Sequence, residues 1–123
     1  MMMPPLFFAL VLAILDGDTI RARIEVWPGH TVETSIRLAG IDTPEMHGAC
    51  PDEKKQAEEA KNVVTRLLPE GAIATVRQVS ADKYFGRVVA QVSTKDNLNI
   101  ADQLLKMGLA HRYDGKKKQS WCP

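Results

Sequence analysis

The feature that most limits how this chain can fold is an alternation of apolar and polar side chains over residues 18–27. A period of two places successive side chains on opposite faces of an extended strand, so this segment predicts a half-buried β-strand. The dipeptide Asp16-Gly17 precedes it and is among the strongest signals for a tight hairpin. The apolar run of residues 6–15 is therefore expected to be the partner strand of that hairpin.

Further signals follow in a recognisable order along the chain. A turn at residues 27–30 leads into a third strand, which completes a meander, and residues 41–51 are expected to form a loop. Asn99 is a suitable N-cap for a short helix that Gly108 ends. The remaining elements are expected as strands at residues 31–39, 72–79 and 87–93, and as helices at residues 52–68 and 99–108.

Five short strands with one helix between the third and the fourth form the element order of an OB-type barrel. We therefore expect an α+β, mainly β chain: an OB-fold-like five-stranded barrel with a further short helix after the fifth strand. The length of 123 residues fits a single domain, residues 1–123, in which residues 114–123 form a polar C-terminal tail. The net charge of +1 and the 45% hydrophobic content exclude a strongly basic coat protein and a disordered tail.

The apolar run of residues 6–15 has two interpretations. It is about half as long as the roughly 20 residues that a membrane-spanning helix needs, so no membrane span is expected. Residues 1–5 contain no Lys or Arg, as the start of an export signal would, and this favours a strand. A remnant of an export signal stays open as the alternative.

Two cysteines, Cys50 and Cys122, have no metal-site spacing and allow one internal disulfide. Each lies next to a proline in an expected loop, which favours the disulfide. Two unrelated thiols in a cytosolic protein are the alternative.

Three carboxylates suggest a metal site. Asp18 has the same parity as the apolar residues of its strand, so its carboxylate is expected to face the buried side, where it needs a cation or several donors. A turn aspartate that binds nearby backbone N–H groups is the alternative. Asp42 and Glu45 follow the third strand, three residues apart. Hard oxygen ligands such as Asp18 and Asp42 suit Ca²⁺ or Mg²⁺ better than zinc.

Two arginines accompany these carboxylates. Arg37 has the opposite parity from its apolar neighbours, and Arg87 begins another strand. Either one alone would be an ordinary solvated arginine. Together with the carboxylates they meet the needs of phosphodiester hydrolysis, in which a metal polarises a phosphate oxygen, arginines offset the developing charge and a carboxylate activates water.

Four stretches in a fixed order identify a family resemblance. They are Asp-Gly-Asp-Thr at residues 16–19, Arg-Leu-Ala-Gly-Ile-Asp-Thr-Pro-Glu at residues 37–45, Asp-Lys-Tyr-Phe-Gly-Arg at residues 82–87, and the segment from Asn99 through Gly-Leu-Ala at residues 108–110. The chain thus resembles the staphylococcal nuclease (thermonuclease) family over residues 10–113, as an SNase-like domain. It departs from the family in one extra residue within residues 84–87 and in ending soon after Tyr113.

The resemblance implies an OB-like barrel and a hydrolase of ester bonds: a Ca²⁺-dependent nuclease that cleaves DNA or RNA with little sequence specificity and leaves 3′-phosphate ends. It also implies a single-stranded or frayed substrate, and we expect a monomer. The implied roles are metal binding for Asp18, Asp42 and the backbone carbonyl of Thr43, phosphate binding and transition-state stabilisation for Arg37 and Arg87, water activation for Glu45, and substrate contact for Tyr84 and Tyr113.

Other interpretations stay open beside this one. A non-catalytic nucleic-acid or peptide-binding module on the same scaffold is the main alternative, and a truncated or inactive product is another. Because bacterial members are mostly exported, a periplasmic or secreted location is slightly favoured over the cytoplasm. Outside the motifs, the three histidines are interpreted as surface or loop residues, Trp27 and Trp121 as packing residues and residues 116–118 as a solvated lysine run.

Overall fold

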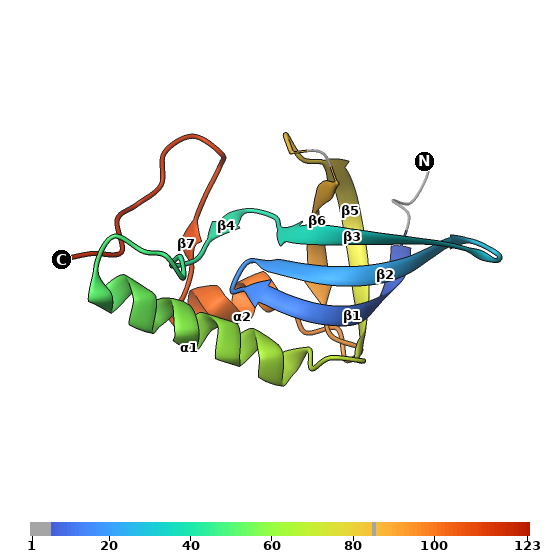
Figure 1. Ribbon diagram of the computed structural model, residues 1–123, viewed down its shortest axis with the longest axis horizontal. Coiled ribbons are helices and arrows are strands. Elements are labelled where there is room, and N and C mark those ends of the chain that lie inside the picture. The colour runs from blue at the N-terminus through green and yellow to red at the C-terminus, as the bar shows by residue number, and fades with distance from the viewer. Residues whose placement is uncertain (1–5, 85) are drawn as a thin grey trace.

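A closed barrel of five strands forms the centre of the molecule (Figure 1). The computed structural model describes residues 6–84 and 86–123. The strand order around the barrel is β1-β2-β3-β6-β5. These strands are β1 (Leu6–Asp16), β2 (Thr19–Trp27), β3 (His30–Leu38), β5 (Ile73–Ala81) and β6 (Arg87–Ser93). The expected OB-fold-like α+β barrel is confirmed, whereas residues 1–5 and Phe85 of the 82–87 motif lie outside the described part.

The strands β3 and β6 are the parallel neighbours in this barrel, and the other barrel pairings are antiparallel. In the β3–β6 register Ser35 lies opposite Arg87, and Arg37 lies opposite Val89. The two arginines singled out in the sequence therefore lie on adjacent strands, two positions apart along the strand direction.

Two helices cover one side of the barrel (Figure 1). Helix α1 (Pro51–Leu67) has Pro at its first turn and two acidic residues there, both favourable at a helix N-terminus. Helix α2 (Ile100–Lys106) is capped by the side chain of Asn99, which accepts the N–H of Asp102 at 2.9 Å. Neither helix of the described chain is long and apolar enough to cross a membrane.

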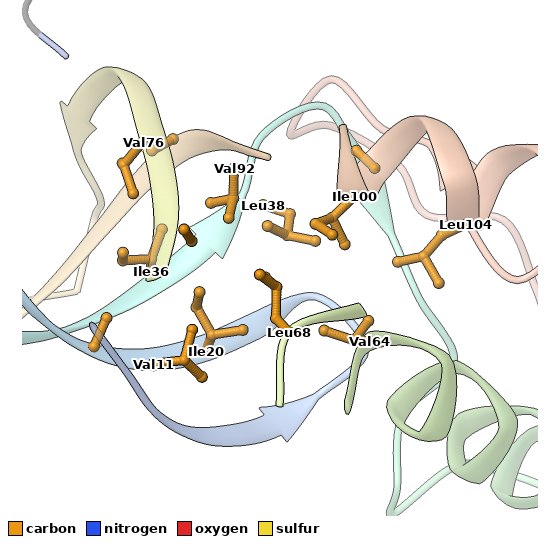
Figure 2. Packing of buried hydrophobic residues seen from close by; sticks show 14 of the residues in the cluster. Val11, Ile20, Ile36, Leu38, Val64, Leu68, Val76, Val92, Ile100 and Leu104 are labelled. Carbon is orange, nitrogen blue, oxygen red and sulfur yellow. The ribbon is translucent and has the colours of Figure 1, made fainter. Parts of the chain in front are cut away.

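The hydrophobic core continues from the barrel to the helices. Figure 2 shows Val64 and Leu68 at the C-terminal end of α1 between Ile20 of the barrel and Ile100 of α2. All four side chains are fully buried. The helices thereby fix the barrel end at which the β1–β2 turn lies.

One expectation about the fold was wrong. Residues 41–51 are not entirely loop, because β4 (Ile41–Asp42) pairs antiparallel with β7 (His111–Arg112). A two-residue strand is too short to show alternation, so no local signal predicts it. The pairing fixes the backbone of Asp42 opposite His111.

The C-terminal tail returns to the start of α1 (Figure 1). The structure joins Cys50 to Cys122, 72 positions apart, through a disulfide. Near that bond the indole of Trp121 stacks on His111 with ring centroids 3.7 Å apart. His111 is half-buried in β7, so its interpretation as a surface or loop histidine was wrong. Trp121 packs as expected, whereas Trp27 is 69% exposed, so its interpretation as a packing residue was wrong.

Candidate functional site

The β1–β2 turn brings Asp18 to the edge of the barrel. The backbone N–H of Asp18 donates to Oδ1 of Asp16 at 3.1 Å and closes the turn. Gly17 between them is enclosed, since a Cβ at this position would lie 2.8 Å from Cβ of Ala60 in α1. Only glycine allows the turn and the helix to approach this closely.

Asp18 is 9% exposed, and its carboxylate has three kinds of partner. The hydroxyl of Thr19 donates to Oδ1 at 3.0 Å, and the backbone N–H of Thr43 lies 3.4 Å from Oδ2. Nη2 of Arg37 lies 3.5 Å from the same Oδ2. Asp18 therefore faces the buried side of its strand, as its parity predicts.

Asp42 is also buried and is approached by cations and donors from two parts of the chain, β3 and the C-terminal tail. Nη2 of Arg37 lies 3.9 Å from Oδ1, so this guanidinium contacts both buried aspartates. Nζ of Lys118 lies 3.4 Å from the same Oδ1, and the indole N–H of Trp121 donates to Oδ2 at 3.4 Å. The tail thus supplies two of the partners of Asp42.

Glu45 follows on an irregular segment before α1. Its side chain is 63% exposed, with Oε1 3.5 Å from Nζ of Lys118. Its backbone N–H donates to Oε2 of Glu53 at 3.0 Å. Among the three carboxylates of Asp18, Asp42 and Glu45, that of Glu45 therefore lies on the solvent-facing side.

The second arginine is held by its own acidic partner. Nε of Arg87 donates to Oδ2 of Asp82 in a close ion pair. Its guanidinium also lies over the ring of Tyr84, 4.7 Å from the centroid. Across the site, the guanidinium of Arg37 lies 5.5 Å from the ring centroid of Tyr113.

These groups line one cleft of about 790 Å³. The structure brings to it every residue that the sequence analysis singled out for chemistry or substrate contact. They are Asp18, Arg37, Asp42, Thr43, Glu45, Tyr84, Arg87 and Tyr113.

The pKa values of the two turn aspartates are shifted in opposite directions. Burial, with the hydrogen bond and charge of Asp18 added, raises the pKa of Asp16 from 3.8 to about 7. Burial also acts to raise the pKa of Asp18, but a hydrogen bond from Asp16, the Arg37 charge and the donors from Thr19 and Thr43 outweigh it and lower this pKa. The pair therefore holds a proton near neutral pH.

Two other groups of the cleft with shifted pKa values are paired ions. Burial acts to raise the pKa of Asp82, but the hydrogen bonds from Arg87 and from the backbone N–H of Lys83, together with the nearby arginine charges, outweigh it and lower this pKa. Burial acts to lower the pKa of Lys118, whereas the charges of Asp42 and Glu45 raise it above its usual value. Both groups stay charged at neutral pH.

The acidic group suits a hard divalent cation. Asp18 and Asp42 offer buried carboxylate oxygens that line the same cleft. Within residues 6–84 and 86–123 no three His, Cys, Asp or Glu side chains form a complete metal cluster. A cation held here would therefore complete its shell with backbone oxygen and water, as Ca²⁺ and Mg²⁺ do.

Sequence reasoning missed several neighbours of the site. Asp16 was visible only as a turn residue, and Asp82 only as part of a motif. Glu53 was only one residue of an expected helix, and Lys118 and Trp121 were assigned to a solvated lysine run and to packing. A five-residue spacing between Asp82 and Arg87 is a local signal for their ion pair, but Lys118 and Trp121 reach the site only through the folded-back tail.

Comparison with known proteins gives several similar chains, among them three that are named endonucleases. An "Uncharacterized endonuclease" of Escherichia coli is 31% identical over 104 residues, which is 85% of this chain and 60% of that protein. A "Probable endonuclease LCL3" of Verticillium alfalfae is 35% identical over 97 residues, 76% of this chain and 32% of that protein. An "Endonuclease Htp3" of Saprolegnia parasitica is 30% identical over 116 residues, 84% of this chain and 54% of that protein. The chain thus spans between 32% and 60% of the length of these relatives.

A sequence model of one family also matches. Its description is "Staphylococcal nuclease homologue", and the match runs over residues 35–121. This range begins in β3 and includes Arg37, Asp42, Glu45 and Arg87, while Asp18 precedes it. Because the match takes in most of the chain, the chain belongs to the staphylococcal nuclease homologue family.

Proposed function

We propose that this chain is a nuclease that hydrolyses phosphodiester bonds of DNA or RNA with little sequence preference. The observation that carries the proposal is the convergence of Arg37 and Arg87, from adjacent strands, on one cleft with two buried aspartates. Such a cleft can bind a phosphate and the charge that develops on it. The family, and the relatives named endonucleases, support this reaction class.

The proposed cation is Ca²⁺, held by the carboxylates of Asp18 and Asp42 with the backbone carbonyl of Thr43. When bound, it would polarise a phosphate oxygen and lower the barrier to attack. The hard oxygen donors described above support this assignment.

Arg37 and Arg87 are proposed to bind the scissile phosphate. The side chain of Arg37 is only 15% exposed and contacts both aspartates, so its position is fixed before substrate arrives. Arg87 uses Nε for Asp82, which leaves its two terminal nitrogens to donate to phosphate oxygens. Donors fixed in advance stabilise a transition state without a reorganisation cost.

Glu45 is proposed to activate the attacking water. Its carboxylate is exposed at the side of the cleft, where water and substrate both have access. The water oxygen would add to phosphorus while its proton passes to Glu45. The bond from phosphorus to the 5′ oxygen would then break, the 5′ oxygen would take up a proton from solvent water, and the phosphate would stay on the 3′ end.

Tyr84 and Tyr113 are proposed to bind the substrate on either side of the phosphate. Both line the cleft, and aromatic rings stack on bases of any sequence. Because a paired base is already stacked in its duplex, we propose a preference for single-stranded or frayed substrate. We also propose that the enzyme is a monomer. The Cys50–Cys122 disulfide supports an oxidising, exported location.

The first test is hydrolysis of heat-denatured DNA, duplex DNA and RNA by the purified protein, with millimolar Ca²⁺ and with excess chelator. Cleavage that needs Ca²⁺ and is fastest on denatured DNA is the expected result. Binding of nucleic acid without cleavage in Ca²⁺, Mg²⁺ or Mn²⁺, by a protein that melts cooperatively, would contradict the nuclease and favour the non-catalytic binding module.

A further inference from the structure

Glu53 is a buried acid with no part in the reaction proposed above. It lies in the first turn of α1, and only 8% of it is exposed. Its Oε2 accepts the backbone N–H of Glu45 and its Oε1 accepts the backbone N–H of Ala49, each at 3.0 Å. One carboxylate therefore binds both ends of the segment that carries Glu45.

This arrangement differs from an ordinary helix cap. A glutamate at the third helical position usually reaches back to the N–H of the N-cap residue. The N-cap here is Cys50, and it makes no side-chain cap hydrogen bond. Glu53 instead binds N–H groups that precede Cys50, so it anchors the incoming segment as well as the helix end.

The segment of residues 45–49 also packs around the Glu53 side chain that anchors it. A Cβ at Gly48 would lie 2.5 Å from Cγ of Glu53, so the backbone passes directly against this side chain. Sγ of Cys122 lies 3.8 Å from Oε1 of Glu53. The disulfide thereby closes over the anchor from the tail side.

Glu45 depends on this anchor for its direction. Its own side chain is mostly exposed, and its side-chain partner is Lys118, which is itself about half exposed. A carboxylate with so few side-chain contacts is aimed chiefly by its backbone. We propose that Glu53 is a positioning residue that fixes the backbone of Glu45 and so aims its carboxylate at the attacking water, an inference that rests on the proposed role of Glu45.

The experiment compares Glu53→Gln with Asp52→Asn, the exposed acid next to it in the same helix turn. A glutamine has one oxygen to accept hydrogen bonds, so at least one of the two N–H groups loses its acceptor. We expect Glu53→Gln to lower kcat about tenfold or more with KM within about twofold. Asp52→Asn, which removes the same charge from the helix N-terminus, should change both by less than about twofold.

A double-mutant cycle separates positioning from a general loss of folding. If Glu53 acts through Glu45, then adding Glu53→Gln to Glu45→Ala should lower the residual rate by less than about twofold. An unchanged tenfold loss in the Glu45→Ala background would overturn the proposal. If Glu53→Gln does not fold, Glu53→Asp, which keeps the charge on a shorter side chain, takes its place in the cycle.

Amide hydrogen exchange supplies a readout that does not depend on activity. The amides of Glu45 and Ala49 should be protected in the wild type and exchange at least about tenfold faster in Glu53→Gln, with the barrel amides unchanged. Unprotected amides in the wild type would overturn the anchor. A folded wild type that cleaves no substrate would overturn the proposed function, while the exchange rates would still decide whether Glu53 fixes this backbone.

Discussion

The ammonium group of Lys118 lies 3.4 Å from Oδ1 of Asp42, a buried carboxylate that the proposed mechanism gives to a divalent cation. The same ammonium lies 3.5 Å from Oε1 of Glu45. A side chain of the C-terminal tail therefore neutralises two acids of the cleft. A cation that binds Asp42 must compete with it.

This competition predicts a gain of affinity on removing the lysine. Lys118→Gln should bind Ca²⁺ about two- to fivefold more tightly, because an exposed ion pair contributes up to about 1 kcal/mol. Titration calorimetry would measure the dissociation constant, with Lys117→Gln as the neighbouring control. Weaker binding in Lys118→Gln than in Lys117→Gln would mean that the lysine does not compete with the cation.

Loss of either cleft arginine should act mainly on the chemical step. Arg37→Ala and Arg87→Ala should each lower kcat by about 10²-fold, the usual cost of a lost transition-state donor. Arg23→Ala is the matched control, since Arg23 lies on β2 and pairs with Glu33 outside the cleft. Rates within about threefold of the wild type for Arg37→Ala or Arg87→Ala would contradict the assigned role.

The raised pKa of Asp16 predicts how stability depends on pH. Because this pKa rises from 3.8 to about 7 on folding, the folded state holds the proton more tightly than the unfolded chain. The resulting stabilisation is complete below about pH 4 and is lost as the pH rises toward 7. In the presence of chelator, the ionisation of Asp16 should therefore make the melting temperature of the wild type lower at pH 8 than at pH 5.

Asp16→Asn tests this dependence directly. Asparagine keeps the oxygen that accepts the N–H of Asp18 and has no charge to lose. Since Asp16 is partly exposed, we expect a gain of only about 1 kcal/mol at pH 8, roughly 4 °C, and little gain at pH 4. Thermal melts of Asp16→Asn and of the exposed control Asp52→Asn would measure this gain in stability. An equal gain of Asp16→Asn at both pH values would show that it does not come from the ionisation of Asp16.

The disulfide should stabilise the protein and hold the tail on the cleft. Reduction, or Cys122→Ser, should cost about 2–5 kcal/mol of unfolding free energy. It should also loosen Lys118 and Trp121, which reach Asp42 from the tail. Urea unfolding of oxidised and reduced protein measures the cost, and a thiol assay of the oxidised protein should find no free thiol.

Much of the fold could be predicted because its signals are local. Alternation located β2 and the inward direction of Asp18, the Asp16-Gly17 turn located its partner β1, and caps located α2. Alternation also placed Arg37 on the polar face, but it could not show that this side chain would be mostly covered. That burial depends on aspartates that only the folded barrel brings beside it.

The rest of the site depends on contacts between distant segments. The two-residue pair β4–β7 has no periodicity, yet it fixes Asp42. Lys118 and Trp121 lie in a polar tail whose path is set by the Cys50–Cys122 bond. Which backbone groups a first-turn glutamate such as Glu53 will bind depends on the path of the preceding segment, and the sequence does not show that path.

The parallel pairing of β3 with β6 has a consequence for variation among related chains. The ladder that places Ser35 opposite Arg87 sets the spacing between the two guanidinium groups, independently of the connection between β5 and β6. Insertions and deletions in that connection that leave Asp82 and Tyr84 in place are therefore tolerable during evolution, as long as the ladder keeps its pairing. A single-residue deletion within β6 would instead turn its arginine to the other face of the sheet, because side chains alternate between faces. Length variation should thus accumulate in the connection and be rare in the strand.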